Sequence, residues 1–394
     1  MGVFLDTLPM SGIVRIRDMM YTVKNPFRLD QGDVSFDAPE TFKQGMRKAI
    51  DENHTHYLPT LGLPRLRQLI AEKLRTKNGI PVESDDEVIV SNGGTHGIYA
   101  ALHAVLEPGD EVICPDPLWP PSLAIVRSAH AVPVQVPVRE ALGFRWDLDE
   151  LAKAITPKTR AIYINSPTNP SGGAFTRGDL ERIAGLAKEH DLWVFSDEAY
   201  EDVLFTGEHV SIASLPGMYD RTIPIYTMSK SYAVTGVRIG YFAIKDPAIR
   251  ARAAKVTLYT ASNVCSIAQY GAIGALEGPQ DCIEEFRTEL KIRRDLFYAG
   301  IKDVAGHVLS GEPPNGAFYA FLKINPDWAR DKGLDQGESV SWTVVEHIIK
   351  HGRVGCVPGL DFGPASEGYI RFCTCRDRKE LNGALESMRA VFAS

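Results

Sequence analysis

The chain has 394 residues, of which 44% are hydrophobic and 24% are charged, as in an ordinary globular protein. This length exceeds what one core usually supports, so we expect two domains or one large domain with an added lobe. The formal net charge of −7 disfavours nucleic acid or an anionic membrane surface as the main partner.

Residues 1–30 are predicted to form an N-terminal arm, because they carry two short basic patches and no long apolar periodicity. They lack a basic region followed by a long apolar stretch. No uncharged apolar run of about eighteen residues occurs elsewhere in the chain. We therefore expect a cytoplasmic protein without a membrane partner.

Seven short runs rich in β-branched and aromatic residues follow and are predicted to be strands. They are residues 87–90, 111–114, 132–136, 161–165, 192–196, 223–226 and 239–244. Helical patterns lie between them, as at residues 95–105 and 178–190. This alternation predicts a large α/β domain over residues 31–285, in which helices flank a mostly parallel seven-stranded sheet. Ligands of such folds usually bind beyond the carboxyl ends of the strands.

A long amphipathic helix is predicted from Asp281 to about Val304, with Phe286 and Phe297 on its apolar stripe. It leads into a smaller α+β C-terminal domain, predicted over residues 286–394 and packed with part of the N-terminal arm. This domain is predicted to contain an apolar segment at 317–322, a helix at 339–350 and a strand at 368–372.

The six cysteines are too sparse for a disulfide framework. In a strand, the thiols of Cys373 and Cys375 would share a face, but no second Cys or His pair with ligand spacing accompanies them. We therefore predict structural thiols and no metal site.

Polar residues collect where the predicted strands end. Gly94 and Thr95 lie in Ser91-Asn92-Gly93-Gly94-Thr95, between a strand and a helix, where backbone amides can bind an anion. Trp119 lies in a proline-rich turn and can present a flat stacking surface. The glycine segment could instead be an ordinary tight turn. Trp119 could instead be an aromatic side chain that covers the surface.

Two further strand ends carry polar side chains. Asn169 lies in a proline-held loop and can serve as a hydrogen-bond donor, although an ordinary turn is also possible. Asp197 ends a very apolar strand, where a carboxylate is costly unless a cation meets it. Asp197 could instead cap the next helix.

Lys230 follows the predicted strand at 223–226, within Thr227-Met228-Ser229-Lys230, and Arg238 comes eight residues later. An amine beside two hydroxyl groups and a guanidinium suits a site that forms a Schiff base with a carbonyl cofactor and binds its phosphate. The alternative is a solvated loop lysine.

Eight segments resemble, in order and approximate spacing, the fold-type I, class I and II aminotransferases that use pyridoxal phosphate. They are residues 57–74, Gly93 to Thr95, Trp119, residues 165–172, Asp197 to Tyr200, Thr227 to Tyr241, residues 315–319 and Arg371. The resemblance spans nearly the whole chain.

The resemblance implies the roles of residues around the cofactor ring. Lys230 would form the internal aldimine and then move the substrate proton as a general base. Asp197 would pair with the pyridine nitrogen and keep it protonated. Tyr200 and Asn169 would hydrogen-bond the 3-oxygen of the ring, and Trp119 would stack on its face.

The resemblance also implies which residues bind the cofactor phosphate and the substrate carboxylate. Gly94, Thr95, Thr227, Ser229 and Arg238 would bind the phosphate. Tyr57 would reach it from a second subunit, so a homodimer with a shared active site is implied. Arg371 would bind the substrate α-carboxylate, assisted by Asn169 and Gly32.

The implied function lies in amino-acid metabolism: transfer of an amino group between an α-amino acid and a 2-oxo acid by a ping-pong mechanism. Thr95 stands where several aspartate- and prephenate-specific relatives carry a lysine, which weakens the case for a dicarboxylate substrate. A replacement cation could come from one of five residues, although each could instead be a solvated surface group; they are Arg15, Arg17, Arg28, His54 and His56.

Two alternatives remain open. A β-eliminating carbon–sulfur lyase would use the same cofactor contacts. An effector-sensing module of a DNA-binding regulator needs an additional helix-turn-helix domain, for which the segment before Asp30 is too short. The acidic net charge also disfavours the regulator.

Overall fold

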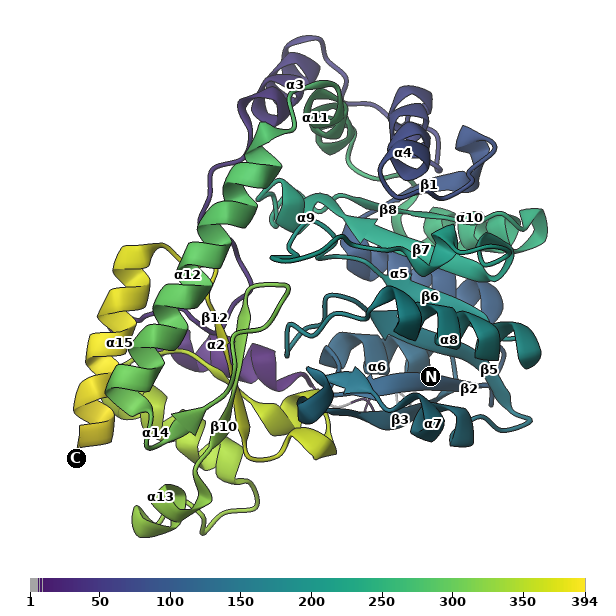
Figure 1. Ribbon diagram of the computed structural model, residues 1–394. Helices are drawn as coiled ribbons and strands as arrows, with labels where there is room; N and C mark the ends of the chain where they lie inside the picture. Colours follow the sequence, from purple (N-terminus) through teal and green to yellow (C-terminus); the bar gives the residue numbers. More distant parts are fainter. Residues whose placement is uncertain (1–5, 7, 9, 394) are drawn as a thin grey trace.

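The computed structural model describes residues 6, 8 and 10–393. Its main sheet has eight strands in the order β1-β8-β7-β6-β5-β2-β3-β4 (Figure 1). The strands are β1 (Val88–Ser91), β2 (Glu111–Asp116), β3 (Val132–Arg139), β4 (Arg145–Trp146), β5 (Thr159–Asn165), β6 (Trp193–Asp197), β7 (Thr222–Thr227) and β8 (Gly240–Ala243). Neighbouring strands from β7 to β3 pair in parallel, whereas β8 is antiparallel to both β1 and β7.

All seven predicted strands are present, but the predicted strand number was one too low. The additional strand, β4, pairs antiparallel with β3 at the edge of the sheet. It forms because Gly143 and Phe144 adopt positive φ and reverse the chain, and because the Trp146 indole donates to the Val136 carbonyl at 2.9 Å. Two residues are too few to show an alternating pattern in the sequence.

Helices cover both faces of the main sheet (Figure 1). Along β5, Ala161 and Tyr163 pack with α5, α6 and α10, whereas Ile162 and Ile164 pack with α7 and α8. Both faces are buried, so the central strands appear in the sequence as nearly continuous apolar runs. The helices of this part are α3 (Glu40–Asp51), α4 (Pro64–Thr76), α5 (Gly93–Val105), α6 (Pro120–Ser128), α7 (Leu148–Lys153), α8 (Arg177–Glu189), α9 (Met228–Ser231), α10 (Pro247–Ala261) and α11 (Ser266–Glu277).

A second, antiparallel sheet has the order β11-β12-β10-β9. Its strands are β9 (Leu309–Ser310), β10 (Tyr319–Ile324), β11 (Val357–Pro358) and β12 (Tyr369–Cys373). Four helices accompany it, namely α12 (Asp281–Ala305), α13 (Pro326–Asp331), α14 (Val340–Gly352) and α15 (Arg378–Ala393). The predicted fold class, a large α/β part plus a smaller α+β part, is thereby confirmed.

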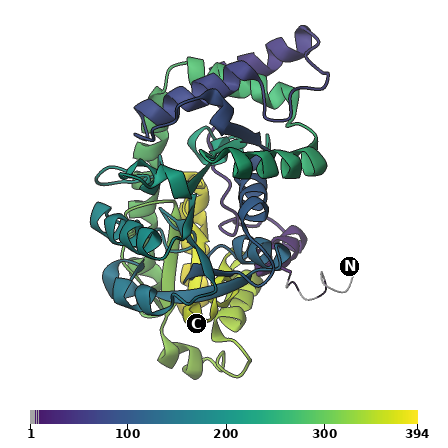
Figure 2. The same cartoon turned by 90° about the vertical axis from the view of Figure 1, so that its right-hand side faces the viewer.

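Helix α12 connects the two parts. Ile283 in its first turn packs with the core beside α4 and α11, whereas Phe297 and Ile301 are buried in the core of the second sheet. The predicted boundary between residues 285 and 286 therefore lies inside one continuous helix, and the boundaries themselves stay a prediction. Helices α3 and α11, distant in sequence, lie side by side at the top of both views (Figures 1 and 2).

The predicted N-terminal arm contains a helix, α2 (Gly12–Thr22), that the sequence patterns did not predict. Its buried residues are Ile16 and Met20, one turn apart, and both belong to the core of the second sheet. Two buried positions are too few to produce a long apolar periodicity. Within the described part of the chain, no helix has the length and apolar character needed to cross a membrane.

Candidate functional site

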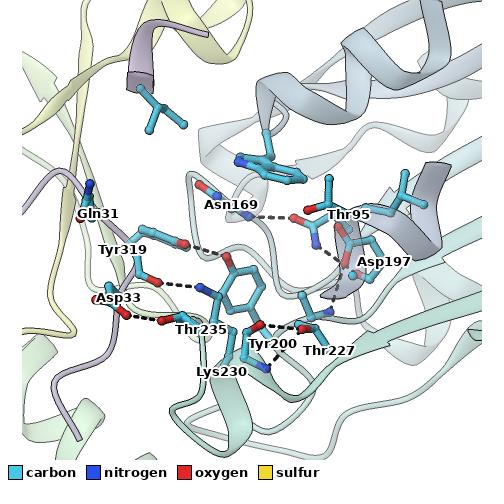
Figure 3. Close-up of a pocket in the computed structure, with 18 of the residues that line it drawn as sticks. Gln31, Asp33, Thr95, Asn169, Asp197, Tyr200, Thr227, Lys230, Thr235 and Tyr319 are labelled. Carbon is cyan, nitrogen blue, oxygen red and sulfur yellow. Dashed lines mark hydrogen bonds between the residues drawn. The ribbon is translucent and has the colours of Figure 1, made fainter. Parts of the chain in front are cut away.

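A cavity of about 340 Å³ lies beyond the carboxyl ends of the central strands, the position predicted for a ligand. Asn165, Asp197 and Thr227, the last residues of β5, β6 and β7, all line it. The second part of the molecule closes the cavity with Arg371 of β12 and with Tyr319 of β10, which is labelled in Figure 3.

Nearly all the predicted site residues line this cavity. They are Gly32, Gly94, Thr95, Trp119, Asn169, Asp197, Tyr200, Thr227, Ser229, Lys230, Arg238 and Arg371. Tyr57 does not line it, and this residue is 89% exposed at the surface. The five candidate replacement cations do not line it either. The three arginines form ion pairs, Arg15 with Glu346 at 2.8 Å, Arg17 with Asp18 at 2.8 Å and Arg28 with Asp30 at 2.9 Å. His54 lies 3.1 Å from the Glu52 carboxylate.

Lys230 lies in α9, the single helical turn that follows β7. The Thr227 side chain begins this turn by accepting from the Ser229 backbone amide at 3.2 Å. The Lys230 Nζ donates to the Gly32 carbonyl at 2.6 Å and points into the cavity (Figure 3). Burial lowers the pKa of Lys230, which favours the neutral amine that a nucleophile or base requires.

Asp197 is a buried carboxylate at the end of β6. The Tyr163 hydroxyl donates to Oδ2 at 3.0 Å, and the Ala199 backbone amide donates to Oδ1 at 3.2 Å. Both donors are neutral, and burial raises the pKa of Asp197 to about 6. A cation entering the cavity would therefore stabilise the ionised carboxylate.

The N-terminus of α5 forms an anion cradle. Its cap residue Asn92 makes no side-chain hydrogen bond to the first turn, so the helix-starting amides are left for another partner. Gly93 has a φ of 76°, and a Cβ atom there would lie 2.4 Å from the Arg238 guanidinium. The hydroxyl groups of Thr227 and Ser229 face the cradle and lie 2.8 Å apart. Helix amides, hydroxyl groups and a guanidinium together suit a phosphate group.

Arg371 is 2% exposed and forms no ion pair with any residue that the structure describes. Its guanidinium donates to the Asn169 side-chain carbonyl at 3.0 Å and to the Asp30 backbone carbonyl at 2.6 Å. Its Nε has no partner among the described residues. A buried guanidinium with neutral partners is well suited to bind an incoming carboxylate.

Several lining residues were not predicted from the sequence; they are Ile13, Asp30, Gln31, Asp33, Ile98, Asn165, Ala199, Thr235 and Tyr319. The Tyr319 and Tyr200 hydroxyl groups lie 2.6 Å apart, and a Cβ at Gly32 would lie 2.6 Å from the Tyr319 hydroxyl. Tyr319 falls in a segment that carried the family resemblance, which could have identified it. No pattern marked Ile13, because α2 itself was not predicted.

No group of three or more His, Cys, Asp or Glu side chains is arranged to hold a metal ion within residues 6, 8 and 10–393. The cysteines are free thiols. Cys114, Cys356, Cys373 and Cys375 are buried, whereas Cys265 is exposed.

Comparison with known proteins identifies the family. The family described as aminotransferase class I and II matches residues 24–388. The chain belongs to the class I and II aminotransferases. This aminotransferase is 36% identical over 390 residues to aromatic-amino-acid aminotransferase 2 of Thermococcus litoralis, covering 98% of this chain and 97% of that protein. It is 37% identical over 390 residues to the aspartate aminotransferase of Pyrococcus abyssi, with the same coverage.

A solved structure agrees with these relatives. The aromatic aminotransferase of Pyrococcus horikoshii OT3 superposes with a TM-score of 0.87 and 38% identity, covering 96% of this chain and 98% of that one. The predicted transaminase activity is confirmed by these matches. The carbon–sulfur lyase is not favoured, and an enzyme is favoured over the effector-sensing module.

Proposed function

We propose that this aminotransferase binds pyridoxal 5'-phosphate in the cavity between β5, β6, β7 and β12, with Lys230 as the amine that binds its aldehyde. The observation that carries the proposal is the Asp197 carboxylate, buried with only neutral donors and facing the same cavity as the Lys230 amine. A ligand with a cationic ring nitrogen at one end and an aldehyde at the other would satisfy both groups.

When bound, pyridoxal phosphate supplies an aldehyde that condenses with amines and a ring that accepts electrons from the substrate. Lys230, whose pKa is lowered by burial, would take the proton from the substrate α-carbon as a general base and deliver it to the carbon that comes from the cofactor's aldehyde. Asn169 accepts from Arg371 through its Oδ1, so its amide N–H groups can donate to a ring oxygen together with the Tyr200 hydroxyl. Trp119 provides an apolar surface for the ring.

The two anionic groups would be held at opposite ends of the cavity. Gly94, Thr95, Thr227, Ser229 and Arg238 bind the phosphate at the N-terminus of α5. Arg371, Asn169 and Gly32 bind the α-carboxylate shared by the amino acid and the 2-oxo acid. Because one carboxylate site serves both substrates, they bind in turn and the kinetics are ping-pong.

A homodimer would complete the site. Thr95 and Arg238 are exposed at the open side of the anion cradle, where a second subunit can reach. Tyr57 is 89% exposed, although an aromatic side chain usually loses much of its surface to packing. We infer that Tyr57 contacts the phosphate in the partner subunit. The cytoplasmic location stays a prediction.

We also propose that amino acids with an uncharged side chain, aromatic ones included, are preferred over dicarboxylic ones. The cationic side chains that line the described cavity are Lys230, Arg238 and Arg371, and each already has a role. Thr95 adds no charge, and the relatives include an aromatic-amino-acid aminotransferase. With 2-oxoglutarate as acceptor, kcat/KM should be higher for phenylalanine than for aspartate. The reverse order would reject this preference.

The Lys230→Ala variant tests the proposed function. It should lose the visible absorbance that pyridoxal phosphate gives to the wild-type protein, and its turnover should fall by at least about a hundredfold. Circular dichroism should show an unchanged fold. Lys245→Ala, at a half-buried lysine paired with Asp220 at 2.9 Å and outside the cavity, is the matched control and should keep both properties. Normal turnover in Lys230→Ala would refute the assignment.

A further inference from the structure

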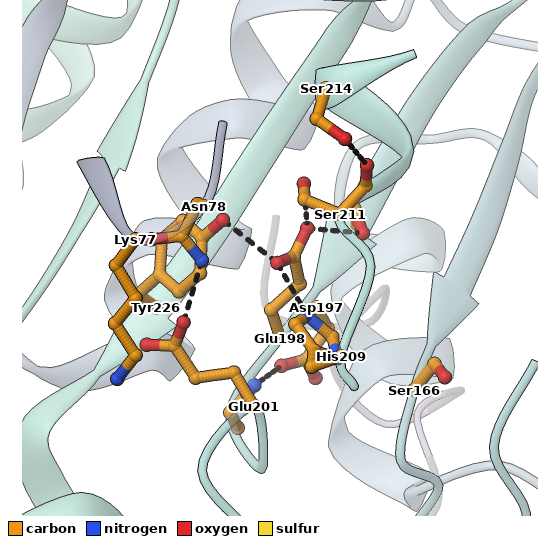
Figure 4. Close-up of polar contacts among 12 residues, drawn as sticks. Lys77, Asn78, Ser166, Asp197, Glu198, Glu201, His209, Ser211, Ser214 and Tyr226 are labelled. Atoms are coloured by element: carbon orange, nitrogen blue, oxygen red, sulfur yellow. Dashed lines mark hydrogen bonds and ion pairs between the residues drawn. The ribbon is translucent and has the colours of Figure 1, made fainter. Parts of the chain in front are cut away.

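A second buried carboxylate directly follows Asp197 but does not line the cavity. Glu198 is 2% exposed and is surrounded by hydrogen-bond donors (Figure 4). Its Oε1 accepts from Ser196 at 2.9 Å and from Ser211 at 2.6 Å. Its Oε2 accepts from His209 at 2.9 Å and from Tyr226 at 2.8 Å. Both carboxylate oxygens are therefore fully used.

These donors come from separate elements. Ser196 is on β6 and Tyr226 is on β7, while His209 and Ser211 belong to the segment after β6. The Glu198 backbone amide also donates to the Ile225 carbonyl on β7 at 2.9 Å. Glu198 thus joins the end of β6 to the end of β7. The end of β6 carries Asp197 and is soon followed by Tyr200. The end of β7 carries Thr227 and is soon followed by Lys230.

The charge of Glu198 is balanced inside the protein. Burial alone would lower the pKa of His209, but the hydrogen bond and charge of Glu198 raise it. Burial likewise would raise the pKa of Glu198, and its bonds to His209 and the hydroxyl groups lower it. Both shifts favour the ionised form of the pair. A buried ion pair contributes little net stability on average, so a role in fixing geometry is a reasonable explanation of its presence.

Transamination requires a defined separation between Asp197 and Lys230. Asp197 ends β6 and Lys230 lies in α9, directly after β7, yet the two must contact opposite ends of one rigid ring. A displacement of about 1 Å between such groups can cost about a hundredfold in rate. Among the described residues, the hydrogen bond from Tyr226 to Glu198 is the most direct side-chain link between the turn after Asp197 and β7.

We propose that Glu198 is a positioning residue for transamination, which holds Asp197 and Lys230 at the separation that the bound cofactor requires. The proposal rests on the proposed function. Glu198 touches neither cofactor nor substrate and acts through Asp197 on one side and through Tyr226 and the β7 end on the other.

The test compares holoenzymes of Glu198→Gln and Glu201→Gln. Glu201 is also buried and ionic, pairing with Lys73 at 2.5 Å and with Asn78 at 2.7 Å, but it has no bond to β7 (Figure 4). Both variants should lower the melting temperature. Only Glu198→Gln should slow a single turnover with an amino acid by about tenfold or more. Only this variant should shift the pKa of the bound cofactor's visible absorbance, by about half a unit or more.

Tyr226→Phe provides a second variant in case Glu198→Gln fails to fold. It removes one bond to Glu198 and leaves the ion pair with His209 intact, so it should show a smaller shift in the same direction. An unchanged absorbance pKa and rate in the folded variants would overturn the positioning role, as would equal changes in Glu201→Gln. If wild-type protein itself gave no cofactor absorbance, the proposed function would fail instead.

Discussion

At the scale of single residues, the buried Asp197 carboxylate makes the stability of the apoprotein depend on pH. Burial raises its pKa from an ordinary 3.8 to about 6, and the hydrogen bonds from its neutral donors offset only part of this rise. The folded apoprotein therefore binds a proton here more tightly than the unfolded chain. The stability gained from this tighter proton binding at Asp197 is complete below pH 3.8 and is lost as pH rises through 6.

We expect this loss to total about 3 kcal/mol, of which about half occurs above pH 5. In Asp197→Asn apoprotein the loss should be absent, so the stability difference between the two apoproteins should grow in favour of the variant as pH rises from 5 to 8. Denaturant unfolding at several pH values measures it. Asp116 and Asp361, whose pKa values burial also raises to about 6, are present in both proteins and cancel. Parallel pH curves would contradict the buried-carboxylate interpretation.

At the scale of elements, the start of α5 is adapted to an anion. Gly93 adopts a positive φ, and the adjacent guanidinium of Arg238 occupies the space of a Cβ atom. The first helical turn lacks a side-chain cap. A helix begun in this way leaves its amides and its positive end facing the cavity.

The Gly93→Ala variant should therefore bind pyridoxal phosphate at least about tenfold more weakly and lose about 1 to 2 kcal/mol of stability. Titration of the apoprotein with the cofactor, followed by fluorescence, measures the affinity. Gly109→Ala is the matched control: Gly109 has a φ of 90°, but a Cβ atom there would have no neighbour within 4 Å. It should lose stability without losing affinity. Equal affinity losses in both variants would show that backbone strain alone is responsible.

At the scale of the whole molecule, the exposed position of Tyr57 leads to a test of the shared active site. If Tyr57 acts across the dimer, mixing Tyr57→Ala with Lys230→Ala subunits creates hybrids in which one site has both native residues. Random exchange would restore about a quarter of the wild-type sites in a symmetric dimer. Activity at low cofactor concentration should rise on mixing, above that of either variant alone. No gain after confirmed subunit exchange would place Tyr57 outside the partner's site.

The strand positions and the cavity edge could be predicted because they depend on local features. Buried strands give short apolar runs, and turn residues end them at nearly the observed places. Since parallel strands place their carboxyl ends on one edge, the strand order of an α/β fold already predicts that Asp197 and Lys230 lie close together. Among the elements that escaped prediction, β4 and α2 have too few buried residues to leave a pattern.

The family, the sheet and most of the residues that line the cavity follow from the amino-acid sequence, since motif order and local periodicity need no tertiary contact. Which distant segments complete the cavity depends instead on tertiary packing. Gly32 accepts from Lys230, and Tyr319 meets Tyr200, across more than a hundred residues of chain. Packing also separates two adjacent carboxylates, Asp197 in the cavity and Glu198 in a closed ionic cluster. Whether a carboxylate faces the cavity or is enclosed depends on which hydrogen-bond donors the packed core brings to it. The spacing of residues along the chain does not encode these tertiary contacts.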